Sequence, residues 1–228
     1  FVVMASVHWM NGTKFDLESI GKRCRETGTR FIVDGSQSVG ALPMEVQKFQ
    51  IDVLICAAYK WLMGPYSTAL SYIHEDFNEG VPLEESWMTR PNSERFDRLT
   101  QYVEGYKPGA TRYDVGQSSN FISMPMLDRG LAQLLEWGIP ESQDYGRILG
   151  KPLLDYFRSK GAPVEEEAFR AHHLMGMRLP TGTNGSALMD ELQSRNVYVS
   201  LRGDNIRISI NVFNDESDVS ELIAALKN

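Results

Sequence analysis

Cysteine is scarce in this chain of 228 residues, because only Cys24 and Cys56 are present. Cys24 lies in a stretch with helical spacing of apolar residues, and Cys56 lies in an apolar, strand-like run. This usage argues against a disulfide framework and against a cysteine-rich zinc site. It is typical of a protein in a reducing compartment, so the sequence predicts a cytoplasmic location.

Long apolar runs and an excess of basic charge are also missing. No apolar run approaches the roughly eighteen residues that a membrane-spanning helix needs. No basic segment precedes an apolar one as in a signal peptide. The formal net charge is -7, with acidic and basic residues interspersed, so the sequence offers no basic face to neutralise a phosphate backbone. The sequence therefore predicts that neither a membrane nor a nucleic acid is a partner.

Alternating apolar runs and helical patterns organise the first half of the chain. Strand-like runs cover 1–7, 30–34, 52–57 and 67–73. A helix is predicted between the first two runs, with Asp16 as its N-cap and Gly28 at its end. This alternation predicts a mostly parallel sheet, in which the fourth strand is either parallel or antiparallel to its neighbour. The first run starts at residue 1 without a methionine or a cap, which predicts that the start of the protein is missing.

The second half of the chain has a different organisation. Residues 78–119 are polar, aromatic and interrupted by Gly and Pro, a stretch too long for an ordinary connection and therefore predicted to line a site. Helical periodicity then returns, and short strands alternate with helices. The predicted helices are 124–137, 141–160, 186–195 and 216–227, and the predicted strands are 173–178, 197–201 and 206–210. The sequence predicts two domains, 1–121 and 122–228, of which the second is a compact α+β unit.

Two reactive side chains follow neighbouring strands of the predicted sheet. Asp34 ends the run at 30–34, and Lys60 comes shortly after the run at 52–57. Ligands bind at the carboxyl ends of strands in open α/β sheets, so both groups are expected at such an edge. A carboxylate that pairs with a pyridinium nitrogen and a lysine that forms an imine are the groups that pyridoxal phosphate chemistry requires. Taken singly, each residue has a plainer explanation, an acid that caps a turn and a solvated lysine.

Residues 33–40 (VDGSQSVG), 52–53 (DV) and 60–65 (KWLMGP) together resemble the class V aminotransferase family. This is a group of fold-type-I pyridoxal phosphate enzymes that includes cysteine desulfurases, kynureninase and isopenicillin N epimerase-like proteins. The resemblance implies an α/β fold, with the second half of the large, mostly parallel-sheet domain in 1–121 and the small α+β domain in 122–228. It also implies that an earlier segment supplies most of the phosphate site.

The resemblance assigns roles to residues of the first domain, with pyridoxal 5'-phosphate as the cofactor. Asp34 is expected to hold the ring nitrogen protonated. Lys60 is expected to form the Schiff base and to move the proton at the substrate's α-carbon. Gln37 matches the position that hydrogen-bonds the phenolate oxygen of the cofactor, although a glutamine in a turn is usually just solvated. Tyr59 is expected near the cofactor phosphate.

Further assignments concern a partner subunit and the substrate. Residues 112–117 (RYDVGQ) resemble a family segment that reaches the phosphate of the partner subunit's cofactor, so Gln117 is a predicted cofactor ligand and a homodimer is expected. The alternative for this segment is a local ion pair between Arg112 and Asp114. Arg207 falls where the family's substrate-carboxylate arginine lies, with a structural salt bridge as the alternative. Arg202 precedes a turn and is expected to be exposed.

The first strand shows a departure from the family pattern. Trp9 stands where many relatives carry an asparagine, and the preceding His8 is expected to be a satisfied structural residue. The resemblance nevertheless predicts an aminotransferase of class V that acts on a small amino-group substrate. Two alternatives stay open. One is an epimerase, racemase or lyase of the same fold, and the other is a truncated remnant that serves only in dimerisation or binding.

Overall fold

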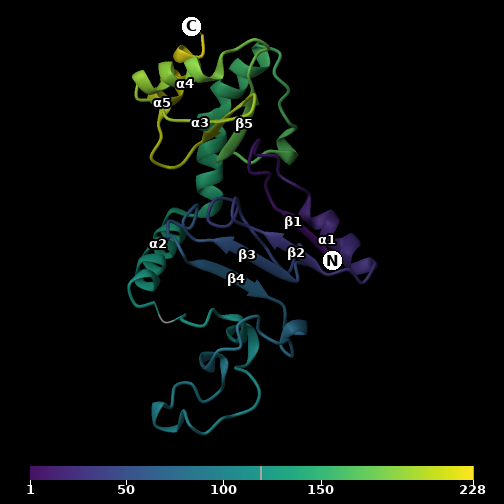
Figure 1. The fold of residues 1–228 in the computed structure, drawn as a ribbon. Coiled ribbons are helices and arrows are strands. Elements are labelled where there is room, and N and C mark those ends of the chain that lie inside the picture. Colours follow the sequence, from purple (N-terminus) through teal and green to yellow (C-terminus); the bar gives the residue numbers. More distant parts are fainter. Residues whose placement is uncertain (119, 228) are drawn as a thin grey trace.

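The computed structural model describes residues 1–118 and 120–227, so residue 119, at the end of the predicted loop, lies outside the described residues. The described residues form two sheets, one with the strand order β1-β2-β3-β4 and one with the order β5-β7-β6. Figure 1 shows the second sheet and its helices at one end of the molecule, the first sheet in the middle, and an irregular segment at the opposite end.

The first sheet agrees with the prediction from apolar runs. Its strands are β1 (Val2–Ala5), β2 (Phe31–Asp34), β3 (Val53–Ala57) and β4 (Ala69–Ile73). The first three are parallel, and β4 pairs with β3 in the antiparallel direction that the sequence left open. Val33 lies opposite Leu54, and both are buried on the same face of the sheet.

Helix α1 (Leu17–Glu26) covers this buried face, and its ends follow the predicted signals. The side chain of Asp16 accepts a hydrogen bond from the Ser19 amide at 3.0 Å, which satisfies one of the unpaired donors of the first turn. Gly28 follows the helix with a φ of +65°, a conformation that glycine adopts without strain. Leu17 packs into the same buried cluster as Val33. The N-cap and the end of this helix are therefore confirmed.

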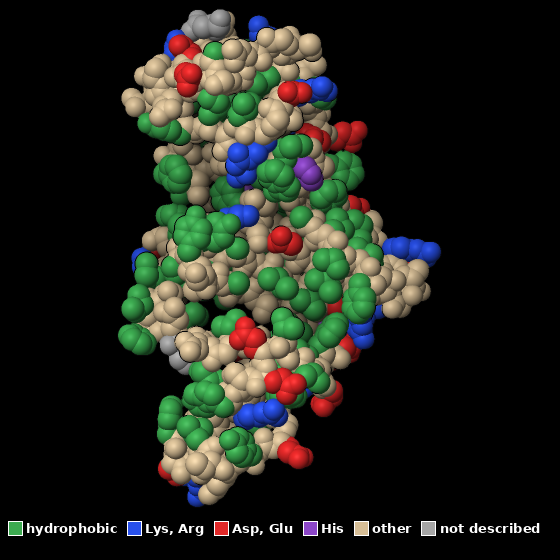
Figure 2. Space-filling model, in the orientation of Figure 1, with side chains coloured by type: hydrophobic (Ala, Val, Ile, Leu, Met, Phe, Trp, Pro, Cys, Tyr) green, Lys and Arg blue, Asp and Glu red, His purple; other side chains and the backbone are tan. Residues whose placement is uncertain are grey.

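The opposite face of the first sheet is open in the part of the chain that the structure describes. Val3 is 69% exposed and Ile55 is 48% exposed, although both lie within strands. No described helix lies in front of the sheet in Figure 1, and Figure 2 shows apolar side chains on the surface there. Parallel strands are normally covered on both faces. Among the described residues, this face therefore lacks the covering layer that a parallel sheet normally has.

The segment between the sheets is held by short 3-10 helices and by one buried arginine. The helices are η1 (Glu75–Phe77), η2 (Trp87–Thr89), η3 (Phe96–Arg98) and η4 (Gly109–Tyr113). Arg112 is only 8% exposed, and its guanidinium donates to the carbonyl oxygens of Lys107 at 3.2 Å and Gly80 at 3.0 Å. The alternative of an ion pair with Asp114 is therefore wrong, because the Arg112 guanidinium instead holds this loop through hydrogen bonds to backbone carbonyl oxygens.

The second half contains the predicted elements, with boundaries shifted by three residues at most. The helices are α2 (Ser123–Trp137), α3 (Ile139–Ser159), α4 (Gly185–Ser194) and α5 (Glu216–Ala225), and the strands are β5 (Leu174–Arg178), β6 (Ser200–Arg202) and β7 (Asn205–Ser209). Leu153, Met177 and Ile206 belong to one buried cluster between this sheet and its helices. No described helix is long and apolar enough to cross a membrane.

Helix α2 packs away from this cluster. Its residues Leu127 and Leu134 are buried with Cys56 and Leu62 of the first sheet and its following loop. Helix α2 therefore packs against the first sheet, while α3 packs against the second sheet. The division of the chain at residues 121 and 122 stays a prediction.

Candidate active site

The turns that follow β2 and β3 lie side by side and are tied together. Asp34 is the last residue of β2, and it lies opposite Ile55 of β3 in the parallel register. The Asp34 Oδ1 atom accepts from the Ser36 amide at 2.8 Å, and the Ser36 hydroxyl accepts from the Ala57 amide at 3.0 Å. One carboxylate oxygen therefore caps the turn, as the plainer explanation supposed. The other oxygen has no hydrogen-bond partner among the described residues, and the side chain is exposed.

A cavity of about 450 Å3 opens beside these turns, between the two sheets. It is lined by Gln37, Tyr59, Lys60 and Trp61 of the first sheet's loops, by Trp9 after β1, and by Arg207 and Asn211 of the second sheet. The structure thus brings together four of the predicted site residues, which come from distant parts of the chain. The volume is in the range of small-molecule sites, roughly 300–1,000 Å3. Asp34 and Gln117 are not among the lining residues, although Asp34 begins the turn that carries Gln37.

Lys60 has no acidic partner in the described part of the chain. Its Nζ atom lies 5.7 Å from the centre of the Tyr59 ring, and that ring stacks on Tyr66 with centroids 4.4 Å apart. The ammonium group therefore rests against an aromatic face at the cavity wall. An amine held in this way is available to a ligand, because no ion pair has to be broken first.

Gln37 is held by a buried polar network that the sequence analysis missed. Trp61 Nε1 donates to the Gln37 side-chain oxygen at 3.1 Å, and His173 Nε2 bonds the Gln37 carbonyl oxygen at 2.7 Å. On its other side, His173 Nδ1 lies 2.7 Å from the Gln143 amide nitrogen. The network joins the loop after β2 to α3 and to the residue before β5. Its partners are far apart in sequence, so no spacing pattern could have indicated it.

His173 is neutral in this network. Burial lowers the pKa of its imidazole to about 4. Since Nε2 faces a carbonyl oxygen it must donate, and Nδ1 then accepts from Gln143. Because Trp61 occupies the side-chain oxygen of Gln37, the free end of that amide is its NH2 group, which has no acceptor among the described residues. Gln37 therefore offers a hydrogen-bond donor to a ligand.

Arg207 enters the cavity from the central strand of the second sheet. Its neighbours Ile206 and Ile208 are buried in the core on one face, so the arginine lies on the opposite face. Its Nε atom is buried without a hydrogen-bond partner, and no described acidic side chain forms an ion pair with it. Burial, together with the charge of Arg202, lowers the pKa of Arg207. The alternative of a structural salt bridge is therefore wrong for the part of the chain that the structure describes.

Two other expectations at the cavity require comment. His8 was expected to be a satisfied structural residue, but its Nδ1 atom is buried and has no partner among the described residues. Trp9 is 51% exposed and contributes an indole to the cavity. It is placed there by the following turn, in which Gly12 has a φ of +76° and a Cβ atom would lie 2.0 Å from the Leu174 carbonyl oxygen. The turn therefore requires glycine.

Gln117 lies elsewhere. Its side chain is exposed on the irregular segment and is not among the residues that line the cavity. The sequence analysis placed it at a partner subunit's cofactor rather than at its own. Its role in binding a cofactor stays a prediction.

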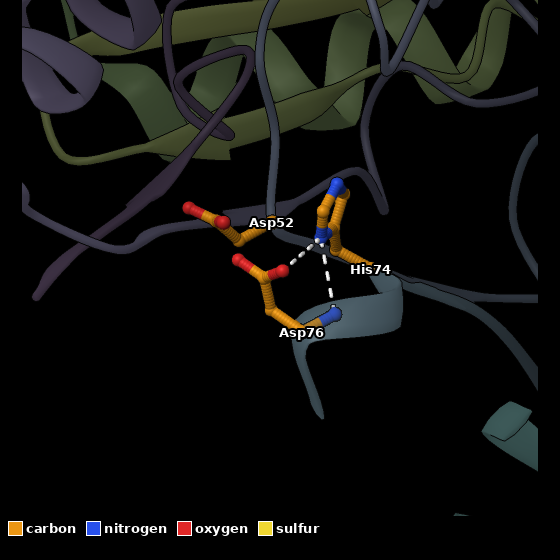
Figure 3. Close-up of side chains that lie close together, drawn as sticks. All are labelled: Asp52, His74 and Asp76. Atoms are coloured by element: carbon orange, nitrogen blue, oxygen red, sulfur yellow. Dashed lines mark hydrogen bonds and ion pairs between the residues drawn. The ribbon is translucent and has the colours of Figure 1, made fainter. Parts of the chain in front are cut away.

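A second group of metal-ligating side chains lies at the other end of β3. Figure 3 shows Asp52, His74 and Asp76 close together. The Arg30 guanidinium bonds both carboxylates, at 3.0 Å from Asp52 and in close contact with Asp76, and it lowers the pKa of Asp76. Asp52 also accepts from the Phe31 amide at 2.8 Å. Both acids are therefore paired with the same arginine, and the group is a structural ion-pair cluster.

The fold is that of fold-type-I enzymes, a class that uses pyridoxal 5'-phosphate. Residues 1–222 match the family described as Aminotransferase class-V, and the chain belongs to this family. The resemblance of residues 33–40, 52–53 and 60–65 to that family is therefore confirmed. The α/β fold predicted from it is confirmed as well.

Among curated proteins, the chain is 22% identical to an uncharacterized aminotransferase, YcbU, of Bacillus subtilis, over 95% of this chain and 56% of that protein. It is 26% identical to an isopenicillin N epimerase of Amycolatopsis lactamdurans, over 90% of this chain and 54% of the relative. A solved complex of the cystine C-S lyase C-DES with cysteine persulfide has a TM-score of 0.85 at 22% identity, covering 99% of this chain and 60% of that one. The chain thus spans little more than half the length of the relatives it matches.

Proposed function

We propose that the protein is a pyridoxal 5'-phosphate-dependent enzyme that acts on a small amino compound, with transamination as its reaction. The observation that carries the proposal is the cavity in which the amine of Lys60 and the guanidinium of Arg207 are both without an acidic partner among the described residues. One group suits attachment of a carbonyl cofactor, and the other suits a substrate carboxylate.

The residues of this chain fit the cofactor. When bound, pyridoxal 5'-phosphate supplies an electron-withdrawing ring that stabilises negative charge at the substrate's α-carbon. Lys60 would hold the cofactor covalently and move the proton at that carbon. Asp34, with one free carboxylate oxygen, would keep a ring nitrogen protonated, and the free NH2 group of Gln37 would donate to the phenolic oxygen. Tyr59, at the cavity wall, would face the phosphate.

Arg207 would orient the substrate. A planar guanidinium binds a carboxylate through two parallel hydrogen bonds, and such a partner would also satisfy the buried Nε atom. The indoles of Trp9 and Trp61 line the same cavity and would exclude water from part of it. Substrate amine and carboxylate would thus be held between the two sheets.

We also propose that the active form is a cytoplasmic homodimer, in which Gln117 completes the partner subunit's site. The segment around Gln117 carries large exposed apolar side chains, including Tyr102 at 97% and Phe121 at 86% exposure. Burial of such side chains against a second copy is favourable, and two-fold dimers are the commonest soluble assembly.

Two other outcomes are supported by specific observations. An epimerase or a lyase would use the same Lys60 and Asp34, and relatives named isopenicillin N epimerase and cystine C-S lyase share this fold. A role limited to binding or dimerisation is favoured by the small number of phosphate donors near Lys60, where Tyr59 is the chief candidate in the part of the chain that the structure describes.

The products identify the reaction. The full-length protein is incubated in heavy water with pyridoxal 5'-phosphate, a panel of L-amino acids and a 2-oxo acid. The Lys60→Ala variant is the control. Transamination predicts a new 2-oxo acid and a new amino acid. A D-amino acid labelled with deuterium at the α-carbon would indicate an epimerase instead, and cleavage of the side chain would indicate a lyase. Cofactor binding without any conversion would leave only the binding role.

A further inference from the structure

Two arginines are neighbours on one face of the second sheet. Ser200 of β6 lies opposite Arg207 of β7, and Arg202 lies opposite Asn205. Directly opposite residues of an antiparallel pair share a face, so Arg202 and Arg207 are diagonal neighbours on the same face. Such positions are about 7–8 Å apart, within reach of long side chains. The core isoleucines of β7 occupy the other face.

Neither positive charge is neutralised within the described residues. Arg202 forms no ion pair with an acid there, and its guanidinium donates only to the Leu201 carbonyl oxygen, at 3.1 Å. The remaining side chains of β6 and β7 on this face are neutral: Ser200, Asn205 and Ser209. The third strand, β5, adds no acid to this face, but it adds the exposed Arg178 opposite Asn205. Arg202 was expected to be exposed, but it is half-buried, as is Arg207. The sheet therefore holds two like charges together, and an anion would remove their repulsion.

Arg207 lines the cavity, and Arg202, which is not among the lining residues, acts on it through its charge. Arg202 contributes to lowering the pKa of Arg207. The cavity lining contains Lys60 and Arg207 as its charged side chains, and no acid. Figure 2 shows Lys and Arg side chains where the unit of the second sheet meets the first sheet. One carboxylate is enough to engage Arg207, which leaves Arg202 as the cation of a second anion site.

We propose that Arg202 binds a second carboxylate of the substrate, so that the substrate is an amino acid with two carboxylates. This assignment rests on the proposed function, because it takes the ligand of Arg207 to be the substrate's α-carboxylate. The amine would then face Lys60, and the distal carboxylate would lie along the sheet toward β6. A substrate with a neutral side chain would leave the Arg202 charge without an anion.

Binding of non-reactive acids tests the assignment without requiring turnover. Succinate and butyrate have the same number of carbons but two carboxylates and one, respectively. Their binding is followed by tryptophan fluorescence of the longest polypeptide that carries this chain, since Trp9 and Trp61 line the cavity. Succinate should bind about tenfold more tightly than butyrate, as expected for one added charge-assisted contact. Arg202→Gln should abolish this preference, whereas Arg207→Gln should weaken the binding of both acids.

Arg129→Gln is the matched control. Arg129 is exposed on α2, which packs against the first sheet, and its guanidinium donates to the Gln133 side chain at 3.2 Å without an acidic partner among the described residues. Its loss should leave the preference for succinate intact, which excludes a general effect of net charge. The proposal is overturned if wild-type protein shows no preference, or if Arg202→Gln retains it. Reductive labelling of Lys60 with the cofactor is measured on the same samples, so a failure of the proposed function is read separately from a failure of Arg202.

Discussion

The two sheets of the protein differ in how completely they are buried: the second has a fully enclosed core, and the first has one exposed face among the described residues. The second sheet and its helices enclose a core in which Leu153, Leu192 and Ile206 have no exposed surface. The first sheet is covered on one face, while Val3 and Ile55 on the other face are largely exposed. The groups proposed to react are on the first sheet, and the arginines proposed to bind the substrate are on the second. In this proposal the reaction takes place on the sheet that has one uncovered face among the described residues.

The largest effect on the reaction should come from the first sheet. Asp34→Asn keeps the shape of the side chain but removes the charge that would hold a ring nitrogen protonated. Turnover should fall by about two orders of magnitude or more, the scale seen when one electrostatic contact to a reacting group is lost. Cofactor binding, followed by absorbance, should be partly retained. Asp204→Asn, in an exposed turn of the second sheet, is the control, and equal turnover in both variants would refute the role of Asp34.

The comparison of the two cores predicts unequal sensitivity to truncation. Leu153→Ala, at a site with no exposed surface, should lower the free energy of unfolding by about 2–5 kcal/mol. Val3→Ala removes apolar atoms from an exposed strand position and should change it by less than about 0.5 kcal/mol. Chemical denaturation of both variants measures the difference. A large loss at Val3 would show that another segment or subunit already covers this face.

The buried contact between the sheets should make stability depend on pH. The pKa of His173 is about 4 in the folded protein, below its usual value of 6.5, so the unfolded chain binds the proton more readily. The contribution is fully present above about pH 6.5 and is lost as the pH falls toward 4, by roughly 3 kcal/mol in all.

Substitution isolates this contribution. His173→Gln should flatten the dependence of the unfolding free energy on pH between these values. The half-buried neighbour His172, whose pKa is also lowered by burial, provides the comparison, and His172→Gln should remove a smaller part. An unchanged pH profile in His173→Gln would mean that another group titrates in this range.

A smaller effect is expected at the second sheet. Arg207→Lys keeps the charge but loses the two parallel hydrogen bonds to a carboxylate, so the apparent affinity for the substrate should fall about tenfold. The absorbance of the bound cofactor should stay unchanged, because Lys60 and Asp34 are untouched. Steady-state kinetics distinguish the two roles, because a loss of substrate binding raises KM and a loss of a reacting group lowers kcat. A loss confined to kcat at Arg207 would contradict its assignment to substrate binding.

Most of the fold could be predicted from the sequence, because each element carries its own local signal. The Asp16 cap, the alternation of apolar runs and the helical periodicity after residue 123 all act over a few residues. The edge that holds Asp34 and Lys60 followed from where two strands end. The sequence was therefore sufficient for elements whose capping, apolar alternation or helical periodicity is set by residues close together in the chain.

The contacts that join the sheets could not be predicted in this way. His173 meets Gln37 across 136 positions and Gln143 across 30, and only folding places them together. Arg112 is buried with its guanidinium donating hydrogen bonds to the carbonyl oxygens of Lys107 and of the more distant Gly80, which no charge pattern indicates. The half-buried state of Arg202 depends on the pairing of β6 with β7. Side-chain environments of this kind are set by tertiary packing.

Attachment of the cofactor to Lys60 is the central claim, and reductive trapping measures it directly. The longest polypeptide that carries this chain is mixed with pyridoxal 5'-phosphate, reduced with borohydride, digested and mapped by mass spectrometry. The account predicts one dominant pyridoxyl group, on Lys60, and its loss in Lys60→Ala but not in Lys48→Ala, which removes an exposed lysine paired with Glu18. A pyridoxyl group distributed over surface lysines, or concentrated on a lysine other than Lys60, would contradict the account.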